Sequence, residues 1–62
     1  MIRFRGAKVT YNDDGEKEYT DRGEIVLKEQ AIIGYYDHTI LMDRHTIFVM
    51  ETLDEIAEKM RW

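Results

Sequence analysis

Apolar and polar residues alternate over the first eleven positions, and a period of two is typical of a β-strand with one buried face. Ile2 and Phe4 share one face of this strand, whereas Arg3 and Arg5 share the other. The alternation slips at Gly6–Ala7. A glycine at such a slip indicates a β-bulge or a sharp bend. The pattern therefore predicts one strand that changes its buried face part of the way along.

Three short polar segments predict chain reversals. Asn12–Gly15 carries the strongest signal, because Asn and Asp bond to their own backbone and glycine accepts a positive φ. Asp21–Gly23 predicts a second turn between two short strands. Asp43–Arg44 has the length of a two-residue hairpin turn between two strands rich in Thr, Ile and Tyr.

The Asp43–Arg44 turn sets a register for its two strands. Ile40 then pairs with Ile47 on one face, which Tyr36 extends; Thr39 pairs with Phe48 on the opposite face, together with Leu41, Met50 and Tyr35. Both faces therefore carry large apolar side chains. A solvated face of an antiparallel sheet is usually polar. One face can pack under a helix, and the second must close a barrel or meet another chain.

The end of the chain predicts a helix. Thr52 and Glu55 have the spacing of a capping box, in which each side chain binds the backbone N–H of the other residue. The apolar residues that follow have the spacing of one buried helix face: Leu53, Ile56, Ala57 and Met60. Trp62 follows the helix, either over the sheet edge or in solvent.

These patterns predict one small domain, residues 1–62, of the mostly β (α+β) class. It has four to five short antiparallel strands and one C-terminal helix. The expected strands lie at about 2–11, 16–20, 24–28, 35–42 and 45–51, and the helix at about 53–61. A small SH3-like barrel is the first interpretation, and an open sheet covered by the helix is the second.

Length and composition limit what such a domain can do. A chain of 62 residues buries a small core, and it has no Cys for disulfides or thiolate metal sites. Oligomerisation or docking on a partner is the remaining common way to stabilise it. The net charge of −4 disfavours non-specific binding to nucleic acid or anionic membrane. With no membrane span and no export signal in the sequence, we expect a cytoplasmic protein.

Catalytic chemistry has little support in the sequence. Ser and Cys are absent, and no nucleophile stands beside a base. Asp37, His38, Asp43 and His45 are the one group that resembles a metal site, but the predicted hairpin separates its histidines and places Asp37 on the opposite face. We therefore expect no enzyme activity, no cofactor, and no catalytic or metal-binding residues. The acidic residues Asp13, Asp14, Glu16 and Glu18 fit a solvated hairpin tip.

A basic N-terminal strand is the one nucleic-acid signal. Small barrels bind single strands with a basic groove and aromatic platforms. The candidate contacts here are Arg3, Arg5, Lys8 and Tyr11. The competing interpretation is a solvated strand whose cations pair with Glu16 and Glu18 across the hairpin. We favour the second, so that single-stranded nucleic-acid binding is the alternative function.

The second half, Ala31 to Met60, resembles small flagellar accessory proteins of the FlbD type. The resemblance is carried by Thr39-Ile40-Leu41, Ile47-Phe48-Val49, Glu51-Thr52 and Glu55-Ile56. The chain departs from that family at Asp43–Arg44, where the family has Asn-Gly, and in its first half. The resemblance implies a non-enzymatic accessory protein; a small phage-encoded protein is an equal alternative.

The leading functional hypothesis is a protein–protein interaction module that self-associates. It follows from a hairpin with two apolar faces in a chain too small to bury both. The candidate interface residues are Tyr35, Leu41, Phe48 and Met50, because aromatic and Met side chains are enriched at interface cores.

Overall fold

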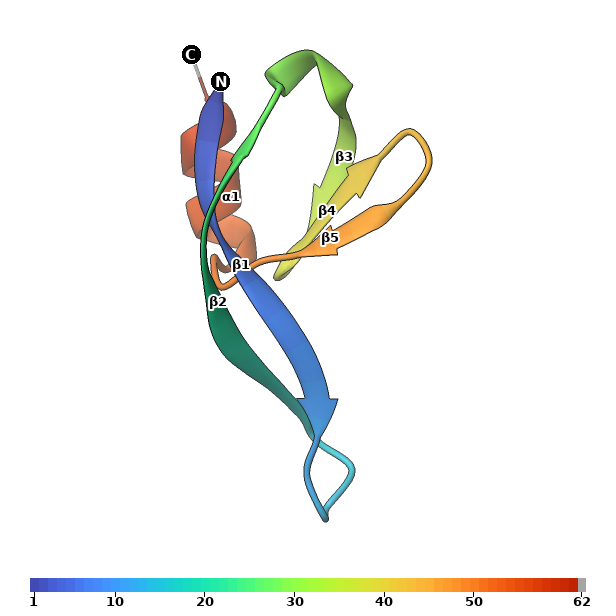
Figure 1. Cartoon of the computed structure of the whole chain (residues 1–62). Helices are drawn as coiled ribbons and strands as arrows, with labels where there is room; N and C mark the ends of the chain where they lie inside the picture. The colour runs from blue at the N-terminus through green and yellow to red at the C-terminus, as the bar shows by residue number, and fades with distance from the viewer. Residues whose placement is uncertain (62) are drawn as a thin grey trace.

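In the computed structural model, which describes residues 1–61, two antiparallel sheets pack with one helix (Figure 1). The elements are β1 (Ile2–Tyr11), β2 (Lys17–Leu27), the 3-10 turn η1 (Glu29–Ala31), β3 (Ile32–Tyr36), β4 (Thr39–Met42), β5 (Thr46–Phe48) and α1 (Leu53–Met60). β1 and β2 form a long hairpin, and the second sheet has the order β3–β4–β5. The predicted mostly β class with a C-terminal helix is confirmed. Trp62 lies outside the described residues.

The two sheets meet where the chain leaves β5. Val49 forms an isolated bridge with Gly6, and the Met50 N–H donates to the Arg5 carbonyl at 2.7 Å. Within residues 1–61 the sheets stay separate, with two and three strands, and they do not close a barrel. The expected SH3-like barrel is therefore wrong. Val49 and Met50 thus pair with the edge of β1 near Gly6, and the chain then continues into α1.

β2 is one strand where two were predicted. Gly6 pairs with Gly23 and Ala7 pairs with Asp21, so Arg22 is an extra, unpaired residue on β2. Gly23 has φ 100°, and its N–H donates to the Asp21 carboxylate at 2.7 Å. The segment is therefore a β-bulge, and the predicted turn at Asp21–Gly23 is wrong. Turns and bulges both use an Asp followed by a glycine at positive φ, and the continuous partner β1 decides for the bulge.

The predicted slip at Gly6–Ala7 is confirmed at this same bulge, although the extra residue lies on the partner strand. Phe4 is buried before the bulge, and Ala7 is buried after it. The rest of the domain therefore packs against opposite faces of β1 on the two sides of the bulge. Farther toward the hairpin tip, the ring of Tyr19 on β2 stacks on His38 with the ring centroids 4.2 Å apart. The β1–β2 hairpin thus crosses the rest of the domain, and its tip projects away from it (Figure 1).

The predicted strand 35–42 is also wrong, because the chain reverses at Asp37–His38 between β3 and β4. His38 adopts φ 57° without being glycine, and the Thr39 hydroxyl donates to the Asp37 carbonyl at 3.0 Å. Asp and His tolerate such turns better than bulky or branched residues do. No glycine marks the reversal, which is why the sequence pattern passed over it.

The second predicted hairpin is confirmed. β4 and β5 flank Asp43–Arg44, and Ile40 pairs with Ile47 as expected. β5 is shorter than the predicted strand 45–51, because beyond Phe48 the chain leaves β4 and turns to β1. The register of this hairpin therefore follows from its turn, whereas its length depends on the neighbouring sheet.

The core contains four fully buried apolar side chains from four parts of the chain. They are Phe4 of β1, Ile40 of β4, Val49 after β5, and Ile56 of α1. Burying an aliphatic or aromatic side chain contributes about 1.5–3 kcal/mol each. A core this small makes each of these contacts a large share of the stability of the domain.

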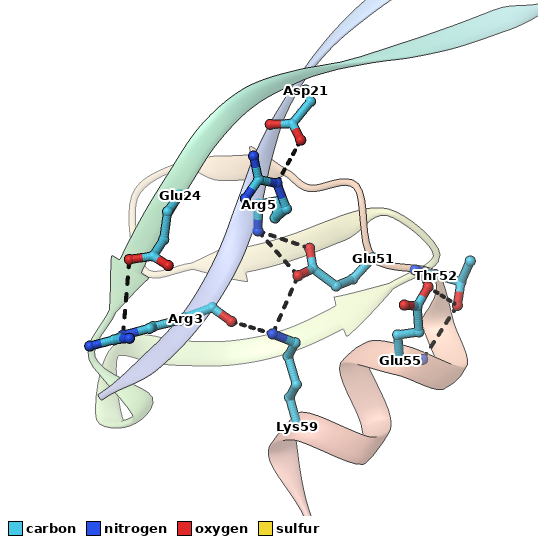
Figure 2. Close-up of polar contacts among 8 residues, drawn as sticks. All are labelled: Arg3, Arg5, Asp21, Glu24, Glu51, Thr52, Glu55 and Lys59. Atoms are coloured by element: carbon cyan, nitrogen blue, oxygen red, sulfur yellow. Dashed lines mark hydrogen bonds and ion pairs between the residues drawn. The ribbon is translucent and has the colours of Figure 1, made fainter.

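The capping box at the start of α1 is confirmed. The Glu55 N–H donates to the Thr52 hydroxyl at 3.3 Å, and the Thr52 N–H donates to the Glu55 carboxylate at 3.1 Å (Figure 2). The Leu53 N–H donates to the Asp37 carboxylate at 2.8 Å. A carboxylate from the β3–β4 turn therefore ties the N-terminus of α1 to the sheet.

A buried carboxylate joins α1 to β1. Glu51 is 7% exposed, and both of its carboxylate oxygens accept from the Arg5 N–H at 3.1 Å (Figure 2). The Lys59 ammonium lies 3.4 Å from Glu51, donates to the Arg3 carbonyl at 2.5 Å, and lies 5.3 Å from the centroid of the Phe4 ring. Glu51, which precedes α1, and Lys59, which lies in α1, therefore both bind backbone groups of β1.

Acid should weaken the helix cap. Hydrogen bonds from the Thr52 N–H and hydroxyl lower the pKa of Glu55 below its ordinary 4.5. A lowered folded-state pKa contributes stability above the unfolded value, and this stability is lost as pH falls through the folded value. We expect Glu55→Gln to reduce the difference between urea midpoints at pH 7 and pH 3. Glu58→Gln, on the same helix and contacting Arg61, is the control; an equal reduction there would contradict the assignment.

Candidate protein-interaction surface

The three-stranded sheet has an outer face turned away from the buried Ile40. Paired residues share a face and successive residues alternate, so the register assigns this face. It carries Gly34, Tyr36, Thr39, Leu41, Thr46 and Phe48. Tyr36 is 62% exposed, Phe48 is 39% exposed, and Leu41 is half-buried. The outer face therefore presents aromatic and aliphatic surface to solvent.

Of the four candidate interface residues, the structure brings Leu41 and Phe48 together. Tyr35 pairs with Ile40 and packs against the core, so its predicted position on the Phe48 face is wrong. The reversal at Asp37–His38 exchanges the faces of the two tyrosines, because it makes residues 32–36 a separate strand. Met50 is half-buried where the chain joins β1, outside the three-stranded sheet.

β3 is an edge strand that carries no charged residue. It contributes Ile33, which is 68% exposed and lies at a register shift between Ile32 and Gly34. The outer edge of β2, by contrast, carries several charges and the Arg22 bulge. Natural proteins protect sheet edges with charges and bulges. The β3 edge has the bulge at Ile33 but no charged residue. Sequence reasoning missed Ile33 and Tyr36, although the absence of charge over residues 31–36 is a visible signal.

A groove lies between β5 and the β1–β2 hairpin. Its volume is about 430 Å³, and its lining is Gly6, Ala7, Arg22, Ile25, Thr46, Ile47 and Phe48. The three consecutive residues of β5 all line it. Because successive side chains of a strand point to opposite faces, the groove faces the edge of β5. The bulge residue Arg22 supplies the one charged side chain of this lining.

Two residues of the basic strand are engaged by carboxylates. Arg5 lies 2.6 Å from Asp21, and Arg3 lies 4.0 Å from Glu24 (Figure 2). The hydrogen bond between Arg5 and Asp21 raises the pKa of Arg5. The same bond, together with the hydrogen bond from the Gly23 N–H, lowers the pKa of Asp21. The cations of this strand are therefore partly neutralised by β2.

The ion partners differ from those expected. Glu16 and Glu18 lie near the hairpin tip, where Glu18 pairs with Thr10. Both ion pairs are diagonal in the register instead: Arg5 pairs with Glu24 but contacts Asp21, which lies opposite Ala7, and Arg3 contacts Glu24. Lys8 and Tyr11 are exposed farther along the arm, with Tyr11 66% exposed. The four candidate nucleic-acid contacts thus extend along β1, and none of them lines the groove beside β5.

The residues that resembled a metal site lie in two turns. Asp37 and His38 form the β3–β4 turn, and Asp43 and His45 lie at the other end of β4. The His38 ring nitrogen Nδ1 lies 3.1 Å from the Val49 carbonyl, and Asp37 accepts from Leu53. Within the described part of the chain, no three His, Asp or Glu side chains are grouped to hold a metal ion.

No family model, curated protein or solved structure matches this chain. Among residues 1–61, no helix is both long and apolar enough to cross a membrane.

Proposed function

We propose that this chain is a non-enzymatic protein-interaction module that self-associates through the edge of β3 and the adjoining outer face. The observation that carries the proposal is the β3 edge, which exposes Ile33 and Tyr36 and has no charged residue. An exposed apolar edge strand offers free backbone groups for pairing with another strand. A chain with net charge −4 can approach its own copy most readily where neither carries charge.

The β3 edge is also complementary to itself. Two antiparallel copies centred on Tyr35 place Tyr36 of each opposite Gly34 of the other, on the outer face. A Cβ on Gly34 would touch only Leu41, at 3.5 Å, so the glycine leaves bare surface there. An aromatic ring over an edge glycine is a known stabilising pair. Each copy would supply one ring and one gap.

The test is the molar mass by light scattering over a dilution series. We expect wild type to form a dimer of the 7.5 kDa chain, and Ile33→Lys to raise the dissociation constant by about tenfold or more, because the interface would bury an unpaired ammonium. The matched control is Val26→Lys, since Val26 is 48% exposed on β2. This variant should dimerise like wild type. A monomeric wild type, or a dimer unaffected by Ile33→Lys, would overturn the proposal.

We further propose a cytoplasmic location and, from the FlbD-type resemblance, a flagellar accessory role, with a small phage-encoded protein as the equal alternative. They describe where such a module would act. The nucleic-acid alternative is not favoured, because Arg3 and Arg5 already contact carboxylates on β2.

A further inference from the structure

We propose that the outer part of the β1–β2 hairpin is a hinged arm, which bends at the glycine bulge and is held closed by the stack of Tyr19 on His38. The arm comprises residues 7–21, beyond the pairing of Gly6 with Gly23. It belongs to the two-stranded sheet, so the inference stands apart from self-association through β3.

The bulge has the features of a hinge. Gly6 pairs with Gly23, so neither residue of this pair carries a side chain, and Arg22 beside them is unpaired. Glycines and an interrupted ladder are the places where a β-ribbon bends. The ion pair of Arg5 with Asp21 spans the bulge, but these side chains are 57% and 40% exposed, so water competes with the contact. The bulge therefore leaves the orientation of the arm to other contacts.

The arm buries little surface of its own. Phe4 lies before the bulge and is fully buried in the core. Beyond the bulge Ala7 is buried and Val9 and Tyr19 are half-buried, whereas most other residues of the arm are exposed. Val9 pairs with Tyr19, and both share a face with Ala7. A two-stranded hairpin alone is marginally stable in water, so the arm depends on the contacts of this one face.

The stack of Tyr19 on His38 joins this face to a fixed point. The ring centroids are 4.2 Å apart, and the ring planes differ by 24°. The Val49 N–H donates to the His38 carbonyl at 3.0 Å, and His38 Nδ1 lies 3.1 Å from the Val49 carbonyl oxygen. Val49 is fully buried, so His38 is anchored to the core. Tyr19 therefore holds the arm against a ring that the core keeps in place.

His38 also has a strained backbone, with φ 57°. A non-glycine residue at positive φ persists where its surroundings hold it, and such residues cluster at switch regions. Tyr19 and Val49 supply this support from distant parts of the chain. Opening of the arm removes one of the two supports and exposes the face of Ala7, Val9 and Tyr19, which the closed state covers.

The test is the measurement of residual dipolar couplings by NMR, which report whether two parts of a molecule keep one relative orientation. We expect the couplings of residues 8–20 in the wild-type protein to fit the alignment of residues 24–61. In Tyr19→Ala they should become smaller than this alignment requires, because the arm samples open orientations. Tyr11→Ala is the matched control, since Tyr11 lies on the same face of the arm and is 66% exposed. It should behave like wild type.

Amide hydrogen exchange provides a second measurement. The Val49 N–H should exchange about two- to tenfold faster in Tyr19→Ala, since an aromatic stack contributes about this factor to an equilibrium. The Ile56 N–H donates to the Thr52 carbonyl in α1 and should change less. Equal acceleration at both amides would overturn the proposal, because it would report loss of the whole fold.

His38→Asn separates the stack from the turn. Asn tolerates a positive φ, so this variant removes the ring and keeps the backbone conformation. It should lower the couplings of the arm as Tyr19→Ala does. Wild-type couplings that fit no common alignment would overturn the proposal, and so would equal couplings in Tyr19→Ala and Tyr11→Ala. Global unfolding of both Tyr19→Ala and His38→Asn would do the same, because the contact would then belong to the core.

Discussion

Replacing Ile56 with alanine is expected to leave much of the chain unfolded at 25 °C. Ile56 is the fully buried residue of α1 and packs with Phe4, Ile40 and Val49, so it makes the main apolar contact that docks α1 on the sheets. Truncating a buried isoleucine to alanine costs about 2–5 kcal/mol. A domain of 62 residues has a total stability of roughly 3–9 kcal/mol. The loss is therefore comparable to the whole.

Urea denaturation followed by far-ultraviolet circular dichroism measures this effect. Leu53→Ala is the matched control, because Leu53 begins the same helix and is 45% exposed. Both variants gain helix propensity, so propensity does not explain a difference between them. We expect Leu53→Ala to lower the stability by less than about 1 kcal/mol. Equal losses in the two variants would show that Ile56 does not anchor the helix.

Replacing Glu51 with leucine is expected to cost about 2–4 kcal/mol, although a leucine would suit an apolar core. The substitution removes the acceptor of the Arg5 N–H and the ion-pair partner of Lys59, whose ammonium keeps its hydrogen bond to the Arg3 carbonyl. Lys59 is 37% exposed, so water compensates part of its loss, and most of the cost comes from the backbone of β1. Glu51→Gln keeps one acceptor for Arg5 and should lose about half as much.

A double-mutant cycle with Lys59→Met separates these contributions. If the Arg5 N–H dominates, Glu51→Leu should cost nearly as much in the Lys59→Met protein as in wild type. Glu58→Leu is the control for removing a carboxylate, since Glu58 contacts Arg61 at the surface. A loss in Glu51→Leu no larger than in Glu58→Leu would refute the anchoring role of Glu51.

Local patterns were sufficient for the elements whose stability is local. The period-two alternation located β1, the Asp43–Arg44 turn set the pairing of Ile40 with Ile47, and Thr52 with Glu55 marked the start of α1. Each depends on residues within a few positions of one another, so the sequence contains all the groups that decide it.

The candidate surface depended on one reversal that sequence patterns did not reveal. His38 adopts a positive φ without glycine, and its ring stacks on Tyr19 and approaches the Val49 carbonyl. Those partners come from distant parts of the chain and support a conformation that local propensity disfavours. Because the chain turns there, Tyr35 packs against the core and Tyr36 reaches the outer face.

By itself, then, the sequence determined the mostly β class, the C-terminal helix, the hairpin register and the location of the bulge. The tertiary structure decided whether Asp21–Gly23 was a turn or a bulge, whether the sheets closed, and which side chains remained exposed. The physical reason is that a bulge, an open edge and a free face are defined by what pairs or packs against them. Those neighbours are distant in sequence: Val49 against Gly6 and Glu51 against Arg5 lie more than forty residues apart along the chain.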